Sequence, residues 1–241
     1  MSAVQEKPLG IKAYGHIGHL PNSRMGPGDH HCHQGQARIA TEKARDRHDQ
    51  IIVTEKVDGS CVAVARKDGV LIPLIRAGWP AAQSRHEMHH LFHHWVMANQ
   101  QRFLDRLQDG ERLVGEWLAL AHGTRYQMAH EPLVIFDLMT GARRLPFRVL
   151  HERLGGQDGF TSPKLLHAGG PIAVPAALEL LGPMGHHGAI EPTEGVVYRV
   201  ERRGEFDFMA KWVRPDKVDG CYLPEVSGQP PVWNWRPGRS G

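Results

Sequence analysis

The 241-residue sequence has few cysteines, no long apolar run and no strong excess of charge of either sign. Its three cysteines, Cys32, Cys61 and Cys221, are scattered and form no Cys-x-x-Cys pair, which argues against a disulfide framework and a thiolate zinc site. No stretch approaches the roughly 18 apolar residues that cross a membrane, and the N-terminus lacks the apolar core of a signal peptide. We therefore expect a cytoplasmic protein with no membrane partner.

Charge and hydrophobic content set only broad limits. The formal net charge of +3 is too weak to demand a polyanionic partner, although the 17 histidines add positive charge below neutral pH. A hydrophobic content of 41% is enough to build the core of one large or two small domains. A nucleic-acid partner is therefore permitted and not required.

The sequence divides into three parts by composition. Residues 1–50 are rich in Gly, Pro and His and predict an irregular lead-in, whereas residues 51–214 carry the regular strand and helix patterns. Residues 215–241 predict an extended tail that is ordered only if its two tryptophans dock.

The patterned part mixes strands and helices. Two apolar runs, 61–66 and 70–75, flank an Asp-Gly pair and predict a β-hairpin. Helical spacing predicts an amphipathic helix over 87–107 with a break near Asn99. Further strands are expected at 112–118, 133–138, 195–200 and 206–213, and further helices at 147–154 and 175–181. This order predicts an α+β fold.

One lysine stands out for its position. Lys56-x-Asp58-Gly59 lies between the apolar runs 51–53 and 61–65, so strands are expected on both sides of it. A lysine amine is a poor nucleophile at its free pKa of about 10.4, but burial and a neighbouring cation lower that pKa by several units. The same pattern recurs at Lys217-x-Asp219-Gly220 in a loop-like context, so Lys56 is the expected nucleophile.

Four further short motifs follow Lys56 along the chain, and their order is more informative than any one of them alone. They are Gly115-Glu116, Phe136-Asp137-Leu138, Glu194-Gly195 and Lys211 within Phe208 to Trp212. With Lys56 in front, residues 51–214 resemble the five ordered motifs of the covalent nucleotidyltransferases, the superfamily of ATP-dependent RNA and DNA ligases and mRNA capping enzymes. The Phe136 motif and the prefix from Tyr14 to Asp29 are similar to the RNA ligase branch.

The resemblance implies an adenylyltransferase (ATP-grasp-like) domain of largely antiparallel sheets flanked by helices. It implies no OB-fold domain, since fewer than thirty residues follow Arg214. The chain departs from the family pattern at Cys61, where Asn is common, and around Lys211, where Met209 and Val213 replace the second lysine of a Lys-x-Lys pair. Arg214 is a candidate for the missing cation.

The same resemblance assigns roles to single residues. Lys56 would attack the α-phosphorus of ATP and carry AMP, Lys211 would lie beside that phosphate, and Glu194 would position Mg²⁺ or Mn²⁺. Glu116 would bind the ribose hydroxyls and Phe136 would stack on adenine. The remaining nucleotide-binding candidates are Glu55 at the adenine pocket, Asp58 and Gly59 in the motif itself, and Arg76, which would reach the nucleotide or the nucleic acid.

The expected function is therefore an ATP-dependent polynucleotide ligase that joins nucleic-acid ends or nicks, with RNA preferred and DNA as the alternative. ATP is favoured over NAD because no nicotinamide-binding region precedes Lys56, and over GTP because the capping architecture is absent. Specificity for ends would come from the lead-in, the histidine-rich helix, the tail or an end-processing partner protein.

Two alternatives come from other classes. His86-Glu87-x-x-His90 matches a zinc-hydrolase pattern, but the helical wheel places five histidines, including His89, on a wet polar face without a cleft. The cluster from His30 to His33 offers ligands that are too closely spaced for one ordinary zinc site. A catalytically inactive nucleotide-binding or nucleic-acid-binding module is the second alternative, favoured by Cys61 and Met209 and opposed by the retained lysines.

Overall fold

The computed structural model describes residues 6–155 and 159–238. The chain forms two compact units, described one at a time below. The first unit contains Met1–Gly15, Ser60–Trp117 and Leu133–Thr161, and the second contains His16–Gly59, Leu118–Pro132 and Ser162–Gly241. The three-part division by composition stays a prediction, and its residues 1–5, 156–158 and 239–241 lie outside the described residues. No described helix is long and apolar enough to cross a membrane.

The first unit is built on a five-stranded antiparallel sheet with strand order β4-β3-β5-β6-β7. Its strands are β3 (Ser60–Lys67), β4 (Val70–Ile75), β5 (Glu111–Trp117), β6 (Leu133–Thr140) and β7 (Arg143–Arg144). The expected hairpin between β3 and β4 is confirmed. Asp68 and Gly69 have φ values of 52° and 76°, and two successive left-handed residues give the tight turn that matches the twist of the strands.

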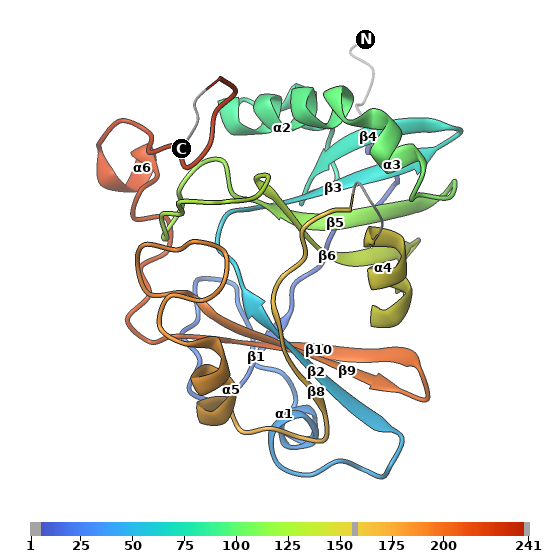
Figure 1. The fold of residues 1–241 in the computed structure, drawn as a ribbon, viewed down its shortest axis with the longest axis vertical. Helices are drawn as coiled ribbons and strands as arrows, with labels where there is room; N and C mark the ends of the chain where they lie inside the picture. The colour runs from blue at the N-terminus through green and yellow to red at the C-terminus, as the bar shows by residue number, and fades with distance from the viewer. Residues whose placement is uncertain (1–5, 156–158, 239–241) are drawn as a thin grey trace. The chain divides into compact units, whose positions relative to one another are not determined.

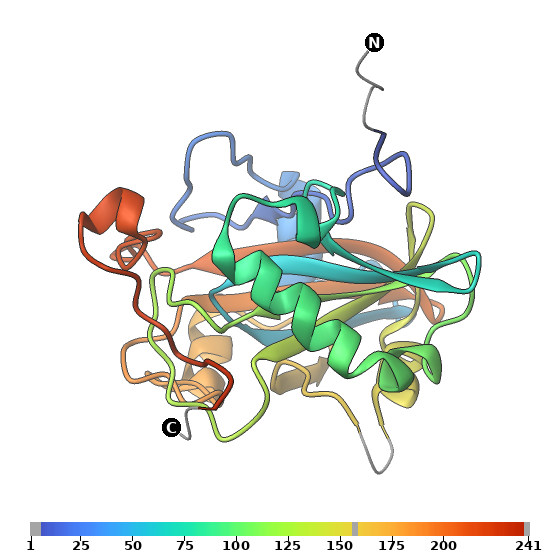
Figure 2. The same cartoon turned by 90° about the horizontal axis from the view of Figure 1, so that it is seen from above.

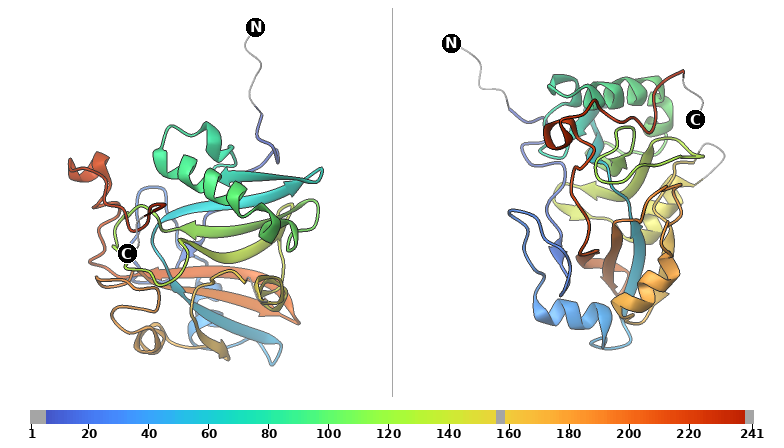
Figure 3. Two further views of the ribbon diagram at one scale, coloured as in Figure 1. Left: turned by 45° about the horizontal axis from the view of Figure 1, so that its top comes forward. Right: turned by 90° about the vertical axis from the view of Figure 1, so that its left-hand side faces the viewer.

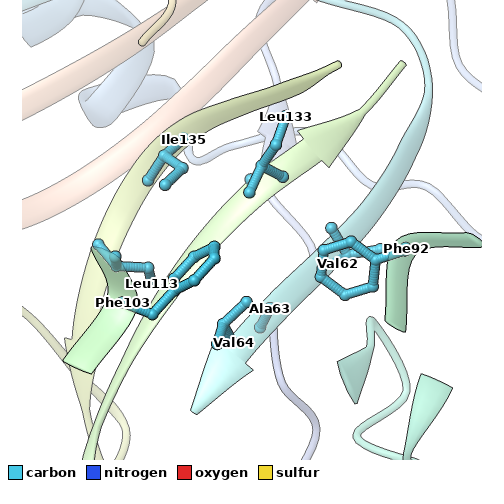
Figure 4. A pocket seen from close by; sticks show the side chains of 9 residues that line it. Val62, Ala63, Val64, Phe92, Phe103, Leu113, Leu133 and Ile135 are labelled. Carbon is cyan, nitrogen blue, oxygen red and sulfur yellow. The ribbon is translucent and has the colours of Figure 1, made fainter. Parts of the chain in front are cut away.

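Helices cover this sheet. α2 (Glu87–Ala98) and α3 (Gln100–Leu104) follow the short helix η1 (Ala81–Gln83), and the break between α2 and α3 falls at Asn99 as expected. Figure 2 shows α2 and α3 lying across the strands of the sheet. Phe92 and Phe103 from these helices meet an apolar surface of β3, β5 and β6 (Figure 4). The lining is entirely apolar, which identifies this space as packed core. α4 (Phe147–Leu154) has the expected bounds and contacts β6.

The second unit contains the other five-stranded sheet, with strand order β1-β10-β9-β2-β8. Its strands are β1 (Gly18–His19), β2 (Asp49–Lys56), β8 (Leu165–Gly169), β9 (Gly195–Arg202) and β10 (Glu205–Val213). All neighbours are antiparallel except β1, which pairs in parallel with β10. The expected α+β fold of largely antiparallel sheets flanked by helices is therefore confirmed.

One face of this second sheet packs against α1 (Gln34–Thr41) and α5 (Val174–Leu181), which lie below it in Figure 1. The core between them contains Ile51 and Val53 from β2 together with Ala37 and Ala40 from α1. The expectation of an irregular lead-in is wrong over α1 and β1. Helix α1 gives no strong apolar periodicity because the side chains it buries fully are only alanines.

Two further elements of the second unit were not expected from the sequence. Strand β8 carries little apolar patterning because it is an edge strand whose residues stay at least partly exposed. The tail contains the single-turn helix α6 (Pro224–Ser227), drawn in red in Figure 3. After α6, Trp233 forms a bridge to Leu120 and Asn234 donates to the carbonyl of Leu118, so the tail is bound to the second unit.

The first unit contains a buried ion pair. The carboxylate of Asp137 is fully buried and accepts hydrogen bonds from Arg144 Nε at 2.8 Å and Tyr14 Oη at 3.1 Å. The guanidinium of Arg144 also lies over the Tyr14 ring at 4.8 Å. Removing one partner of such a pair leaves the other charge buried and uncompensated.

We expect Asp137→Ala to lower the free energy of unfolding by about 3 to 5 kcal/mol in a urea titration, because it leaves the buried charge of Arg144 uncompensated. The matched control is Glu152→Ala, which breaks an ion pair with Arg148 whose side chains are 58% and 77% exposed. That loss should be about 0.5 kcal/mol or less. Equal losses in the two variants would contradict the assignment of Asp137 as a buried partner.

Candidate active site

The predicted nucleophile lies at the end of a strand. Lys56 is the last residue of β2, and its Cα pairs with that of Gly195, the first residue of β9. Glu194 directly precedes β9, so the pairing of the two strands brings the side chains together, and Lys56 Nζ donates to Glu194 Oε2 at 2.7 Å. Burial raises the pKa of the Glu194 carboxyl, and the positive charge of Lys56 opposes that rise.

The glycine that follows Glu194 in the motif, Gly195, is required by the close packing of β9 against β10. Its φ is 154°, and a Cβ at this position would lie 2.0 Å from the carbonyl oxygen of Trp212 on β10. A side chain here would push β10 away from β9. The glycine therefore allows the start of β9 to pack against β10. This packing keeps Glu194 beside the end of the Lys56 side chain.

Lys211 lies on the same face of the sheet as Lys56. On β9, Val197 pairs with both Thr54 and Lys211, and directly paired residues share a face of the sheet. Thr54 is two residues before Lys56, so Lys56 and Lys211 project from the same side with β9 between them. Neighbouring strands lie about 4.8 Å apart, which sets the two lysine Cα atoms about 10 Å or more apart.

Residues of the lead-in surround Lys211. His19 on β1 is the parallel partner of Lys211, and its ring is 1% exposed. His19 Nδ1 lies 2.7 Å from Ser23 Oγ, and Nε2 lies 3.0 Å from a carboxylate oxygen of Asp29. The other oxygen of Asp29 is 3.6 Å from Lys211 Nζ. Burial lowers the pKa of His19, and the charge of Lys211 lowers it further. The sequence did not predict these contacts between the lead-in and Lys211. The feature that could have indicated them is the similarity of the prefix from Tyr14 to Asp29 to the RNA ligase branch.

Glu55 points to the opposite face because side chains alternate along β2. Its carboxylate is fully buried, and Oε2 accepts a hydrogen bond from the backbone N–H of His186 at 2.9 Å. Within the described residues, Oε1 has no hydrogen-bond partner. His187 Nε2 is 4.0 Å from Oε2, and its Nδ1 is 3.0 Å from His130 Nε2. Burial raises the pKa of Glu55 to about 7.

Asp58 and Gly59 form the turn that leads from β2 to β3. The backbone N–H of Asp58 donates to Tyr126 Oη at 2.9 Å, and Asp58 Oδ2 accepts from the backbone N–H of Gly123 at 2.9 Å. The ammonium of Lys217 forms an ion pair with the same oxygen. Burial alone would raise the pKa of Asp58, but the charge and hydrogen bond of Lys217 lower it overall.

Three predicted site residues, Arg76, Glu116 and Phe136, belong to the first unit. Arg76 follows β4, and its Nη2 donates to the carbonyl of Gly15 at 3.1 Å. Glu116 lies on β5 and Phe136 on β6, and both are half-buried. The Phe136 ring meets Tyr14 edge-on with centroids 5.3 Å apart. The structure thus brings Lys56, Glu194 and the motif turn together in the second unit, and the roles of Arg76, Glu116 and Phe136 stay predictions.

The zinc-hydrolase alternative finds no support. His86 precedes α2 and is not helical, so it does not share a helix face with His90, whose Nε2 is 2.5 Å from the carbonyl of Ser84. The expected wet face is wrong for His89, which is buried with its two ring nitrogens within hydrogen-bond distance of Ser60 and Ser84. Across residues 6–155 and 159–238, no three His, Cys, Asp or Glu side chains are arranged to hold a metal ion.

Comparison with protein families identifies the class. The family model described as RNA ligase matches residues 49–213. The match spans more than half of the chain and contains Lys56, Glu194 and Lys211. The protein belongs to the RNA ligase family. A search of curated proteins gave no match.

Solved structures of Naegleria gruberi RNA ligase mutants are similar in fold. One with ATP and Mn has 18% identity, covers 93% of this chain and 64% of its own, and gives a TM-score of 0.50. Another with AMP and Mn has 17% identity, with coverages of 87% and 62% and a TM-score of 0.49. A third with ATP and Mn has 18% identity, 76% and 53% coverage, and a TM-score of 0.48. The chain thus spans about half to two thirds of their length.

The buried Glu55 carboxyl makes stability depend on pH. Its pKa rises from 4.5 in the unfolded chain to about 7 in the folded protein, so the folded state holds a proton that the unfolded state has lost. Stability then falls as pH rises between these values. We expect Glu55→Gln to be as stable as the wild type near pH 4.5 and more stable above pH 7, by up to about 3 kcal/mol.

Thermal or urea unfolding at several pH values measures this difference. The control is Glu152→Gln, whose side chain is 58% exposed and should show no such pH-dependent gain. If the difference in stability between Glu55→Gln and the wild type stays constant from pH 4.5 to 8, Glu55 is not a buried, proton-binding carboxyl.

Proposed function

We propose that the protein is an ATP-dependent RNA ligase that carries AMP on Lys56. The observation that carries the proposal is the contact of Lys56 with Glu194 at 2.7 Å on the sheet face that also bears Lys211. Membership of the RNA ligase family supports the same reaction class. The similar solved structure with ATP and Mn supports the choice of nucleotide and divalent metal.

The reaction has three steps. The Lys56 amine, after losing its proton, forms a P–N bond with the α-phosphorus of ATP, and the bond to the leaving pyrophosphate breaks. The AMP then moves from Lys56 to a 5′-phosphate end, which forms a phosphoanhydride and releases the lysine. A 3′-hydroxyl finally attacks the activated 5′-phosphate, so a phosphodiester forms and AMP leaves.

Charged side chains of the second unit fit two requirements of the first step, a cation at the α-phosphate and a group that binds adenine. Lys211 supplies a cation for the α-phosphate, and Asp29 holds its ammonium at 3.6 Å on the face that carries Lys56. The orphan oxygen of Glu55 is an acceptor suited to an exocyclic amino group, which adenine has and guanine lacks at the corresponding position. Glu116, Phe136 and Arg76 complete the proposed nucleotide-binding set through ribose, base and phosphate contacts.

Glu194 would hold a divalent cation, Mg²⁺ or Mn²⁺. Magnesium commonly uses one or two protein carboxylates and takes its other ligands from substrate phosphates and water, so a single buried carboxylate beside the nucleophile fits. When bound, the cation neutralises phosphate charge and assists departure of pyrophosphate. Glu194 itself orients the Lys56 amine through their shared hydrogen bond.

The proposed substrates are nucleic-acid ends or nicks, with RNA preferred because the family model is that of RNA ligases. DNA is the second candidate, since the superfamily chemistry is the same for both. An end-processing or specificity partner protein and a cytoplasmic location belong to the same proposal.

The decisive experiment incubates the protein with α-labelled ATP and Mg²⁺ or Mn²⁺ and measures label that survives denaturation. We expect labelled wild type, unlabelled Lys56→Ala, and a loss of about 100- to 1000-fold in rate for Lys211→Ala, which removes the cation at the phosphate. Lys43→Ala is the control, because Lys43 is exposed and lies outside the site. A wild type without label, or a labelled Lys56→Ala, would refute the proposal.

A second experiment decides the substrate. Duplexes with one nick in an RNA strand or in a DNA strand are offered at equal concentration, and the sealed product is measured over time. We expect faster sealing of the RNA nick, because the 2′-hydroxyl is the group by which proteins distinguish RNA from DNA. Faster sealing of the DNA nick would favour the DNA ligase alternative.

A further inference from the structure

The second copy of the motif has a buried lysine that the proposed reaction does not use. Lys217 belongs to Lys217-x-Asp219-Gly220, and its side chain is 1% exposed. Its ammonium contacts Asp58 Oδ2 and donates to Thr124 Oγ1 at 2.7 Å. A Cβ placed on Gly123 would lie 2.7 Å from Lys217 Nζ, so the backbone there closes directly over the ammonium.

The two copies of the motif are therefore joined, with the lysine of one bound to the aspartate of the other. The aspartates of the two copies differ in their surroundings. Asp219 is 56% exposed and forms an ion pair with Arg24. Asp58 instead is held from two sides, by Lys217 and by the N–H of Gly123 at 2.9 Å. Its own N–H donates to Tyr126, so both the backbone and the side chain of the turn after Lys56 are fixed.

Removing Lys217 would leave two carboxylates and one lysine in this place. Asp58 would lose its only ion-pair partner among the described residues, two positions from Lys56. An uncompensated carboxylate that is only 14% exposed attracts a nearby cation, so it would compete with Glu194 for the Lys56 ammonium. Lys217 thus keeps Asp58 from drawing the Lys56 ammonium away from Glu194.

We infer that Lys217 is a positioning residue for the adenylylation of Lys56: it neutralises Asp58 and fixes the turn from Asp58 to Gly59 against residues 123–126. This inference rests on the proposed function. It concerns the first step of the reaction, in which the Lys56 amine attacks. In the last step the 3′-hydroxyl is the nucleophile, and the position of the Lys56 amine matters less.

The test compares Lys217→Met with the wild type in two assays. The rate of Lys56 adenylylation should fall about 100-fold, the loss typical of a misplaced reacting group. Sealing of a strand that already carries 5′-AMP should change less than about threefold, because that step does not use Lys56 as nucleophile. Equal losses in both steps would show a merely structural role and overturn the inference, as would an unchanged rate of adenylylation.

Two further variants separate charge from folding. Asp58→Asn combined with Lys217→Met leaves a neutral pair, so adenylylation should recover about tenfold over Lys217→Met alone. No recovery would overturn the part of the inference that assigns Lys217 to neutralising Asp58. Asp219→Asn is the matched control from the same tetrapeptide, and its rate should stay within about twofold of the wild type because its ion pair is exposed.

Amide hydrogen exchange tests the anchor without any reaction. The Gly123 amide, which donates to Asp58, should exchange at least about tenfold faster in Lys217→Met than in the wild type. Unchanged exchange would overturn the anchoring role. If the wild type takes no label from ATP, the proposed function fails, and this exchange measurement still decides whether Lys217 fixes the turn.

Discussion

The contact between Lys56 and Glu194 depends on the register of β2 against β9. Lys56 pairs with Gly195, so Glu194 falls directly beside the strand end that carries the lysine. A shift of one residue would turn Lys56 to the core face and bring Glu55 to its place. The register is strongly set, because Ile51 and Val53 on β2 must meet the core covered by α1 and α5. Hydrophobic packing on one face thereby fixes the charged site on the other.

Strand alternation also separates the roles of two adjacent residues. Lys56 faces Glu194 and shares its side of the sheet with Lys211, whereas Glu55 is buried on the opposite side with a carboxyl oxygen that no described group satisfies. The surroundings of the two carboxylates differ accordingly. Glu194 is buried against a cation. Glu55 is buried and accepts a hydrogen bond from the backbone N–H of His186, and burial outweighs that hydrogen bond and raises its pKa to about 7.

Contacts around the site come from both ends of the chain. The lead-in supplies His19 and Asp29 beside Lys211, and the segment after β10 supplies Lys217 beside Asp58. Both segments have loop-like compositions. The lead-in is ordered by the pairing of β1 with β10. The connection between β5 and β6 forms hydrogen bonds both to the motif turn, through Gly123, and to the tail, through Leu118. Segments without apolar periodicity can thus hold the charges on which a site depends.

The sequence by itself determined the elements and the order of the motifs. The Asp68-Gly69 turn, the break at Asn99 and the helix Phe147–Leu154 follow from turn chemistry and periodicity, which act over a few residues. Only the tertiary structure decided which charges are buried and paired. Asp58 and Lys217 are separated by 159 positions, and the burial of His89 depends on serines from two other segments. Partners so distant leave no local pattern, because burial is decided by packing between elements.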